Sequence, residues 1–179
     1  KMSNFEIKAQ PQPGLYLLVC PYFVDQRGDF AKLFNSDSFA KLPISFTPAE
    51  SFVTRSHSGV LRGMHFQVDE ASHDKLVYCA AGRALDVVVD VRPKSPYFNR
   101  PYAVELSPQS ELSLFIPKGY AHGFLALEDQ CCMIYHVSTV HSPTHDRGVL
   151  WSSIDFKWPS QDPILSMRDA AHPPISELL

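Results

Sequence analysis

The residues best suited to chemistry in this chain lie between Gly59 and Gln67, with Lys75 a short way beyond. Arg62 and His65 stand there among apolar residues. They are an odd number of positions apart, so on a regular strand their side chains would face opposite sides. Gly63 lies between them and can host a β-bulge that turns both to one side. A permanent cation beside a titratable base suits removal of a proton from an anionic substrate.

A second segment of similar character runs from Ile116 to Leu127 and contains His122 within an apolar stretch. The turn Pro117-Lys118-Gly119 precedes this histidine. Together the two segments predict a small β-barrel with a polar cleft inside it.

Composition narrows the class of protein. The 179 residues suffice for one domain with a substantial core, and the net charge of −3 does not indicate a protein that binds nucleic acid or a membrane surface. No apolar run approaches the length of a membrane span, and no secretory signal is evident. The four cysteines have neither zinc-site nor disulfide-framework spacing, which predicts reduced thiols in a cytoplasmic protein. They are Cys20, Cys79, Cys131 and Cys132.

Short apolar and β-branched runs between turn signals predict an all-β fold, read as a single domain over residues 1–179. Ser36–Leu42 is the one helix candidate, with Ser36 as its N-cap. Ala81-Gly82-Arg83 predicts a tight turn, and prolines predict an irregular arm over residues 141–179. The predicted strands are Leu15–Cys20, Phe46–Arg55, Val60–Phe66, Lys75–Ala81, Arg83–Asp90, Tyr102–Leu106, Leu112–Ile116, Gly123–Ala126 and Cys131–Val137.

Several stretches, in a fixed order along the chain, carry a family resemblance. They are Asp25–Phe30, Ser58–Gln67, Asp86–Arg92, Lys94–Phe98, Ile116–Leu127, Trp158-Pro159 and Ser166–Asp169. The chain resembles the dTDP-4-dehydrorhamnose 3,5-epimerase family of cupin-like enzymes. The resemblance implies a jelly-roll barrel with short peripheral helices and a homodimer that exchanges N-terminal strands. It also implies no metal and no cofactor, and a nucleoside-diphosphate 4-keto-6-deoxy sugar as substrate, inverted at C3, C5 or both through an enolate.

The resemblance also implies roles for five residues. His65 matches the catalytic base, and Asp169 matches the aspartate that orients the imidazole and stabilises its cation. Tyr135 matches the general acid, because a phenol remains protonated at neutral pH. Lys75 and His122 match residues near the keto oxygen, where positive charge stabilises an enolate.

Substrate binding is assigned in the same way. Arg27 and Arg62 match ligands of the diphosphate, which an arginine fork suits, and Arg27 is expected to act on the site of the neighbouring subunit. Gln67, at the end of the first motif, is a further substrate-binding candidate. Asp86, Asp90 and Arg92 also match the family pattern, and we interpret them as barrel-wall or rim residues without chemistry.

Three positions near the expected nucleotide base depart from the family pattern. Glu50 and Phe52 stand where the family usually carries Gln and Asn, and His141 stands in place of a tyrosine. His141 with Phe30 can still enclose a base, and a carboxylate at Glu50 can accept from an amino or ring N–H group. The nucleotide of the substrate therefore stays open between dTDP, CDP and GDP.

Three other functions compete. A metal-dependent cupin would use the Pro-x-Gly-x-x-His motif ending at His122, but His65-Phe66-Gln67 does not supply the first cupin motif, His-x-His. A nucleotide-sugar 3,4-ketoisomerase would not need Tyr135 as an acid. A non-catalytic sugar-binding cupin would not need a base, an acid, a lysine and arginines together.

Overall fold

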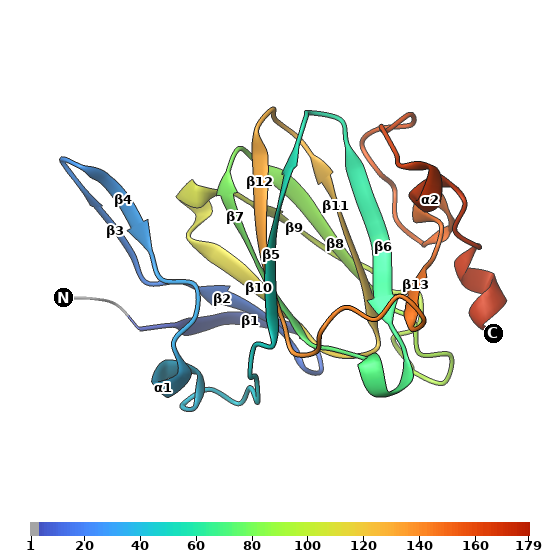
Figure 1. The fold of residues 1–179 in the computed structure, drawn as a ribbon, viewed down its shortest axis with the longest axis horizontal. Helices are drawn as coiled ribbons and strands as arrows, with labels where there is room; N and C mark the ends of the chain where they lie inside the picture. Colours follow the sequence, from blue (N-terminus) through green and yellow to red (C-terminus); the bar gives the residue numbers. More distant parts are fainter. Residues whose placement is uncertain (1–3) are drawn as a thin grey trace.

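The computed structural model describes residues 4–179 and consists of two β-sheets packed face to face (Figure 1). One sheet has six strands, in the order β1 (Glu6–Gln12), β2 (Leu15–Val19), β10 (Leu112–Ile116), β7 (Lys75–Ala81), β12 (Cys131–Val137) and β5 (Glu50–Ser56). The other has five, in the order β13 (Asp146–Gly148), β6 (Leu61–Gln67), β11 (Tyr120–Ala126), β8 (Ala84–Asp90) and β9 (Tyr102–Leu106). A separate hairpin pairs β3 (Tyr22–Asp25) with β4 (Gly28–Ala31).

Side-chain alternation explains how the two sheets meet. Along β12 every second residue is buried and the residues between are half-buried, as expected for a strand with one face in a core. Val77, Leu114, Val88 and Phe124 bring both sheets into the same apolar cluster. The predicted all-β fold is therefore confirmed, although no hydrogen-bonded ladder among the described strands closes the sheets into a barrel.

Each sheet also has a covered outer face. Phe39 and Phe46, from the segment between β4 and β5, pack with Phe115 on the six-stranded sheet. Val149, Trp158 and other residues of the C-terminal segment pack on the five-stranded sheet. This segment forms a short strand, β13, as well as turns, so it is more regular than the arm predicted from the sequence.

The helices are short and lie at the periphery. The α-helices are α1 (Ser36–Phe39) and α2 (Met167–Ala170), and the 3₁₀ helices are η1 (Asp69–Ala71), η2 (Pro108–Ser110), η3 (Trp151–Ser153) and η4 (Ile175–Leu178). The prediction for α1 was wrong in two respects: the N-cap is Asn35, whose Oδ1 accepts from the Ser38 N–H at 2.9 Å, and the helix ends before Leu42. Pro43 disfavours helical geometry at Leu42. No helix within residues 4–179 is long and apolar enough to cross a bilayer.

All nine predicted strands form, and β7, β9, β10 and β12 have the predicted ends. Gly82 makes the predicted turn between β7 and β8 with a φ of +69°. Strands β1, β3, β4 and β13 were not predicted. Strand β1 contains Pro11, which is tolerated because β1 lies at the edge of its sheet.

Candidate active site

A cavity of about 200 Å³ lies between the sheets and gathers most of the predicted site residues. The strands β5, β6, β7, β11 and β12 each contribute side chains to it. The predicted residues among its lining are Arg62, His65, Gln67, Lys75, His122 and Tyr135. Residues far apart in the sequence therefore share one polar pocket.

A bulge at Gly63 brings Arg62 and His65 to the same side of β6, as predicted. His65 pairs with His122 of β11 and Arg62 pairs with Phe124, so β6 has one more residue in this interval than β11. Gly63 has a φ of +144°, and a Cβ there would lie 2.6 Å from Gly123 Cα. Only glycine fits this conformation and this close approach.

His65 is held by the carboxylate of Asp169. Its Nε2 lies 2.6 Å from Asp169 Oδ1, while Asp169 Oδ2 accepts from the Gly63 N–H at 3.1 Å. The side chain of Ser166 caps the short helix α2 by accepting from the Asp169 N–H at 3.0 Å, which fixes the aspartate beside β6. Burial alone would raise the pKa of Asp169, but hydrogen bonding and charge from His65 lower it overall.

This contact also sets the tautomer of His65. A carboxylate only accepts, so Nε2 carries the proton and Nδ1 has the free lone pair. An imidazole held in this way can take a proton from a substrate at Nδ1 and share the resulting charge with the buried carboxylate.

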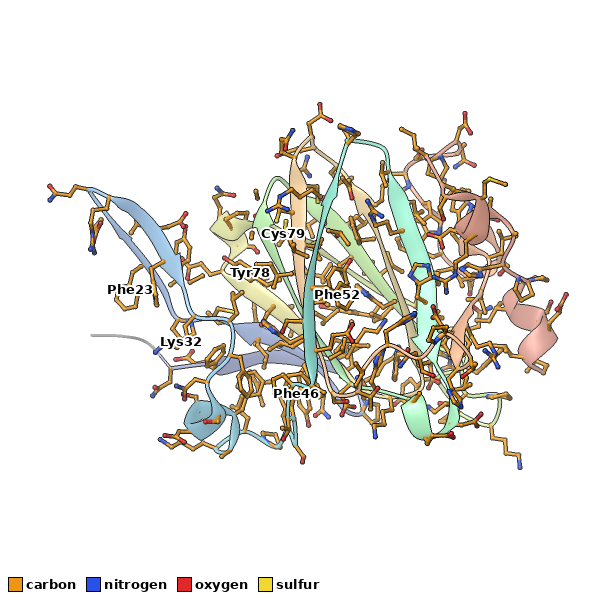
Figure 2. All side chains as sticks on the ribbon, in the orientation of Figure 1. Phe23, Lys32, Phe46, Phe52, Tyr78 and Cys79 are labelled. Carbon is orange, nitrogen blue, oxygen red and sulfur yellow. The ribbon has the colours of Figure 1, made fainter. Side chains whose placement is uncertain are left out.

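Tyr135 lies on β12, the opposite sheet from His65, with a buried side chain. Burial raises the pKa of its phenol, so the hydroxyl keeps its proton at neutral pH. Phe52, which Figure 2 labels on β5, stacks on the Tyr135 ring with centroids 4.5 Å apart and planes 15° apart. The stacking fixes a proton donor on the wall of the cavity.

His122 has a partner that the sequence interpretation did not assign. Both carboxylate oxygens of Asp86 lie 2.9 Å from His122 Nε2, and both residues are buried. Asp86 is a buried residue of the sheet, as expected, and it also holds the ring of His122, a contact that the sequence interpretation did not include. A carboxylate on the same strand face as the buried Ala84 and Val88 is the sequence signal that points to such a partner.

Lys75 lies at the start of β7 with only 7% of its surface exposed. Its Nζ donates to the backbone oxygen of His65 at 3.3 Å. Burial lowers the pKa of Lys75 to about 8, and the carboxylates of Asp146 and Asp86 oppose that shift only in part. A desolvated ammonium in the cavity is well placed to stabilise negative charge on a bound molecule.

The amide of Gln67 is occupied by the protein itself. Its Nε2 donates to Ala71 O at 2.8 Å and its Oε1 accepts from the Ser142 N–H at 2.8 Å. Glu50 Oε2 accepts from the His141 N–H at 2.9 Å, so these two predicted residues meet each other at the edge of β5. The hydrogen bonds of Gln67 thus stabilise the segment that follows β12. Neither Glu50 nor His141 lines the cavity.

Arg27 and Phe30 do not reach the cavity of their own chain. They lie on the β3–β4 hairpin, which projects from the body at the end opposite α2 in Figure 1 and carries Phe23, labelled in Figure 2. The Arg27 side chain is 85% exposed and forms an ion pair with Asp25. Their predicted role across a dimer stays a prediction.

Other residues of the cavity were missed in the sequence. Arg168, adjacent to Asp169, donates from Nη2 to Asp146 Oδ2 at 2.7 Å. His73, two residues before Lys75, also lines the cavity, and burial followed by the charge of Lys75 lowers its pKa to about 4. His73 is therefore neutral at physiological pH.

Comparisons with known proteins identify the family. A family profile described as dTDP-4-dehydrorhamnose 3,5-epimerase matches residues 10–177. The chain belongs to the dTDP-4-dehydrorhamnose 3,5-epimerase family. A family member from Shigella flexneri is 38% identical over 163 residues, which cover 88% of each chain.

Solved structures agree. The epimerase from Bacillus anthracis, crystallised with TDP and PPi, has a TM-score of 0.91 and 32% identity, covering 95% of this chain and 99% of its own. ChmJ from Streptomyces bikiniensis, a 3'-monoepimerase crystallised with dTDP-quinovose, has a TM-score of 0.85 and 30% identity, covering 91% of this chain and 84% of its own. These matches confirm the predicted cupin-like fold and the predicted class of enzyme, an isomerase. They do not favour the metal-dependent cupin or the ketoisomerase.

Proposed function

We propose that this enzyme inverts C3, C5 or both in a nucleoside-diphosphate 4-keto-6-deoxyhexose, by proton transfer and without a cofactor. The observation that carries the proposal is one cavity that holds a carboxylate-bound imidazole, His65, and a buried phenol, Tyr135, on opposite sheets. Inversion at a carbon beside a ketone requires a base on one face and an acid on the other.

His65 is the base. Its Nδ1 removes the proton from the carbon beside the ketone, and the C–H electron pair moves into the enolate. Asp169 stabilises the imidazolium that forms, 2.6 Å from Nε2. Lys75 and His122 line the same space. Lys75 stabilises the enolate oxygen as a cation, and His122, whose ring is held by Asp86, lies beside the keto group.

Tyr135 completes the inversion. The phenol delivers its proton to the opposite face of the same carbon, which restores the ketone, and solvent then reprotonates the phenolate. The raised pKa of Tyr135 keeps the hydroxyl protonated until the enolate, a strong base, is present.

Arg62 binds the diphosphate inside the cavity, with Ser56 Oγ accepting from its Nε at 3.0 Å and fixing the guanidinium. We assign Arg27 and Phe30 to the cavity of a second copy, because neither lines the cavity of its own chain and their hairpin projects away from the strands that do (Figure 1). The enzyme then acts as a homodimer.

Mixed dimers test this assignment. His65→Ala and Arg27→Ala are each expected to be nearly inactive, yet their mixture should regain activity because one site per heterodimer keeps both residues. Recovery approaching a quarter of the wild-type rate is expected if subunits exchange freely. A mixture that forms heterodimers and stays inactive would show that Arg27 serves its own chain.

The thymidine nucleotide is the first candidate base, because the relatives are named as dTDP-sugar enzymes and one was crystallised with dTDP-quinovose. CDP and GDP forms compete because Glu50 carries a carboxylate that can accept from an amino or ring N–H group of the nucleotide base; its Oε2 accepts from the His141 backbone N–H at 2.9 Å. We place the enzyme in the cytoplasm, where its four unpaired thiols would stay reduced.

Proton NMR in heavy water tests the function. The dTDP, CDP and GDP forms of the 4-keto-6-deoxyglucose substrate are each incubated with enzyme. Deuterium at C3, or at C3 and C5, with one of the three nucleotides supports the proposal. The result also identifies the nucleotide base of the substrate and the carbons that react. No exchange with any of the three would refute it.

A further inference from the structure

A second histidine shares the carboxylate that holds His65. His172 Nε2 lies 3.2 Å from Asp169 Oδ1, the same oxygen that His65 contacts at 2.6 Å. The two imidazole rings meet edge to face, with centroids 5.5 Å apart and planes 76° apart. His172 does not line the cavity, so it acts on a substrate only through Asp169 and His65.

The fold provides a fitted place for this ring. Gly148 of β13 pairs with His65 of β6, and the ring of His172 lies directly over it. A Cβ on Gly148 would lie 2.3 Å from His172 Nε2, so the glycine leaves the space that the imidazole fills. The side chain of His172 is 9% exposed and that of Asp169 is 5% exposed, so the contact between them is shielded from solvent.

We propose that His172 is a positioning residue that donates to Asp169 and thereby weakens the hold of this carboxylate on the proton of His65. This inference rests on the proposed function, in which His65 is the base. Asp169 Oδ1 accepts two N–H groups, so less of its negative charge is directed at the imidazolium of His65 than a single contact would direct.

The surroundings keep His172 neutral. Burial lowers its pKa, and the charge of His65 lowers it further, while the opposing effect of Asp169 is smaller. A neutral ring facing a carboxylate carries its proton on Nε2, which makes it a donor. The other titratable or charged groups that line the cavity with His65 are Arg168 of α2, Asp146 of β13, Arg62 of β6, Lys75 of β7, His122 of β11, Tyr135 of β12 and His73, which precedes β7. The charge of Arg168 also lowers the pKa of His172.

Removing the His172 donor should shift the pH dependence of the reaction in one direction. Asp169 would then hold the His65 proton more tightly, so His65 would become a free base only at higher pH. The acidic limb of the pH–rate profile for deuterium exchange should move upward by roughly 0.5–1 pH unit, which is less than the full strength of one hydrogen bond to a charged group because the effect reaches His65 only through Asp169. KM should stay unchanged, because His172 contacts no substrate.

Three variants test the proposal. His172→Phe keeps a ring in the space over Gly148 but cannot donate, and His172→Gln keeps an N–H donor. Gly148→Ala displaces the native imidazole. The acidic limb should move upward in His172→Phe and Gly148→Ala and stay near its wild-type position in His172→Gln.

NMR of isotope-labelled histidines in the free enzyme gives a readout that does not need activity. In wild type, His172 should appear as the neutral Nε2–H tautomer, and in His172→Phe the His65 ring should take up its proton at higher pH than in wild type. Absence of exchange in wild type would overturn the proposed function. An active wild type whose acidic limb is unmoved in folded His172→Phe or Gly148→Ala would overturn only this inference, as would a loss of rate with no shift.

Discussion

Replacing Lys75 with methionine should make the protein more stable while it destroys activity. Burial lowers the pKa of Lys75 from 10.5 to about 8, so the folded state binds this proton less tightly than the unfolded chain. At 1.36 kcal/mol for each pH unit of difference, keeping the ammonium charged in the cavity costs about 3 kcal/mol at pH 7. Methionine fills a similar volume without a charge. It loses the long 3.3 Å contact to His65 O and the attraction of Asp146 and Asp86, which the lowered pKa already includes.

The stability difference between wild type and Lys75→Met should depend on pH. Below about pH 8 the lysine is charged in both states and the whole cost is present. Between about pH 8 and 10.5 the unfolded chain binds more protons than the folded one, so wild type gains stability with rising pH and approaches Lys75→Met. Above about pH 10.5 the lysine is neutral in both states, so the cost of burying its charge disappears.

Urea unfolding at fixed protein concentration measures this difference at pH 7 and pH 10. At pH 7 we expect Lys75→Met to be more stable by about 2–3 kcal/mol, or roughly 4–12 °C in Tm, and the gap to shrink at pH 10. Lys41→Met, at an exposed position, is the matched control and should change little at either pH. A variant no more stable than wild type at pH 7, or a gap independent of pH, would refute the reasoning.

Three further predictions concern the same cavity. The rate of deuterium exchange should fall above about pH 8 as the Lys75 ammonium loses its proton, and a constant rate up to pH 10 would remove Lys75 from the mechanism. Gly63→Ala should destabilise the fold by about 2–4 kcal/mol in urea unfolding, because of its φ of +144° and its closeness to Gly123; a smaller loss than about 1 kcal/mol would contradict the packing described. Asp169→Asn should lower the exchange rate on the order of 10³-fold while KM stays similar, and a decrease below about 10-fold would show that His65 works without it.

Local pattern predicted much of the fold. Strand alternation located the central strands, and Gly63 between Arg62 and His65 predicted the bulge that turns both residues into one cavity. The unpredicted strands lack such a pattern. The hairpin β3–β4 is four residues a side and mostly exposed, and β13 has three residues, of which only Gly148 is buried.

The partners inside the site depend on contacts between distant residues. Asp169 is 104 residues from His65, and only the family resemblance connected them in the sequence. Strand periodicity indicates that Asp86 is buried and needs a partner, but it does not identify His122 as that partner. It gives no sign of the contact between His172 and Asp169. Gln67 is the converse case, because its place in a motif does not reveal that its amide is already bonded.

The central claim is that His65 removes a proton from one face and Tyr135 returns one to the other. The most direct test compares wild type, His65→Ala and Tyr135→Phe in heavy water, with deuterium incorporation and product configuration followed together by NMR. The account predicts exchange with inversion in wild type, no exchange in His65→Ala, and exchange with little inversion in Tyr135→Phe. Inversion by Tyr135→Phe at the wild-type rate, or exchange by His65→Ala, would contradict it.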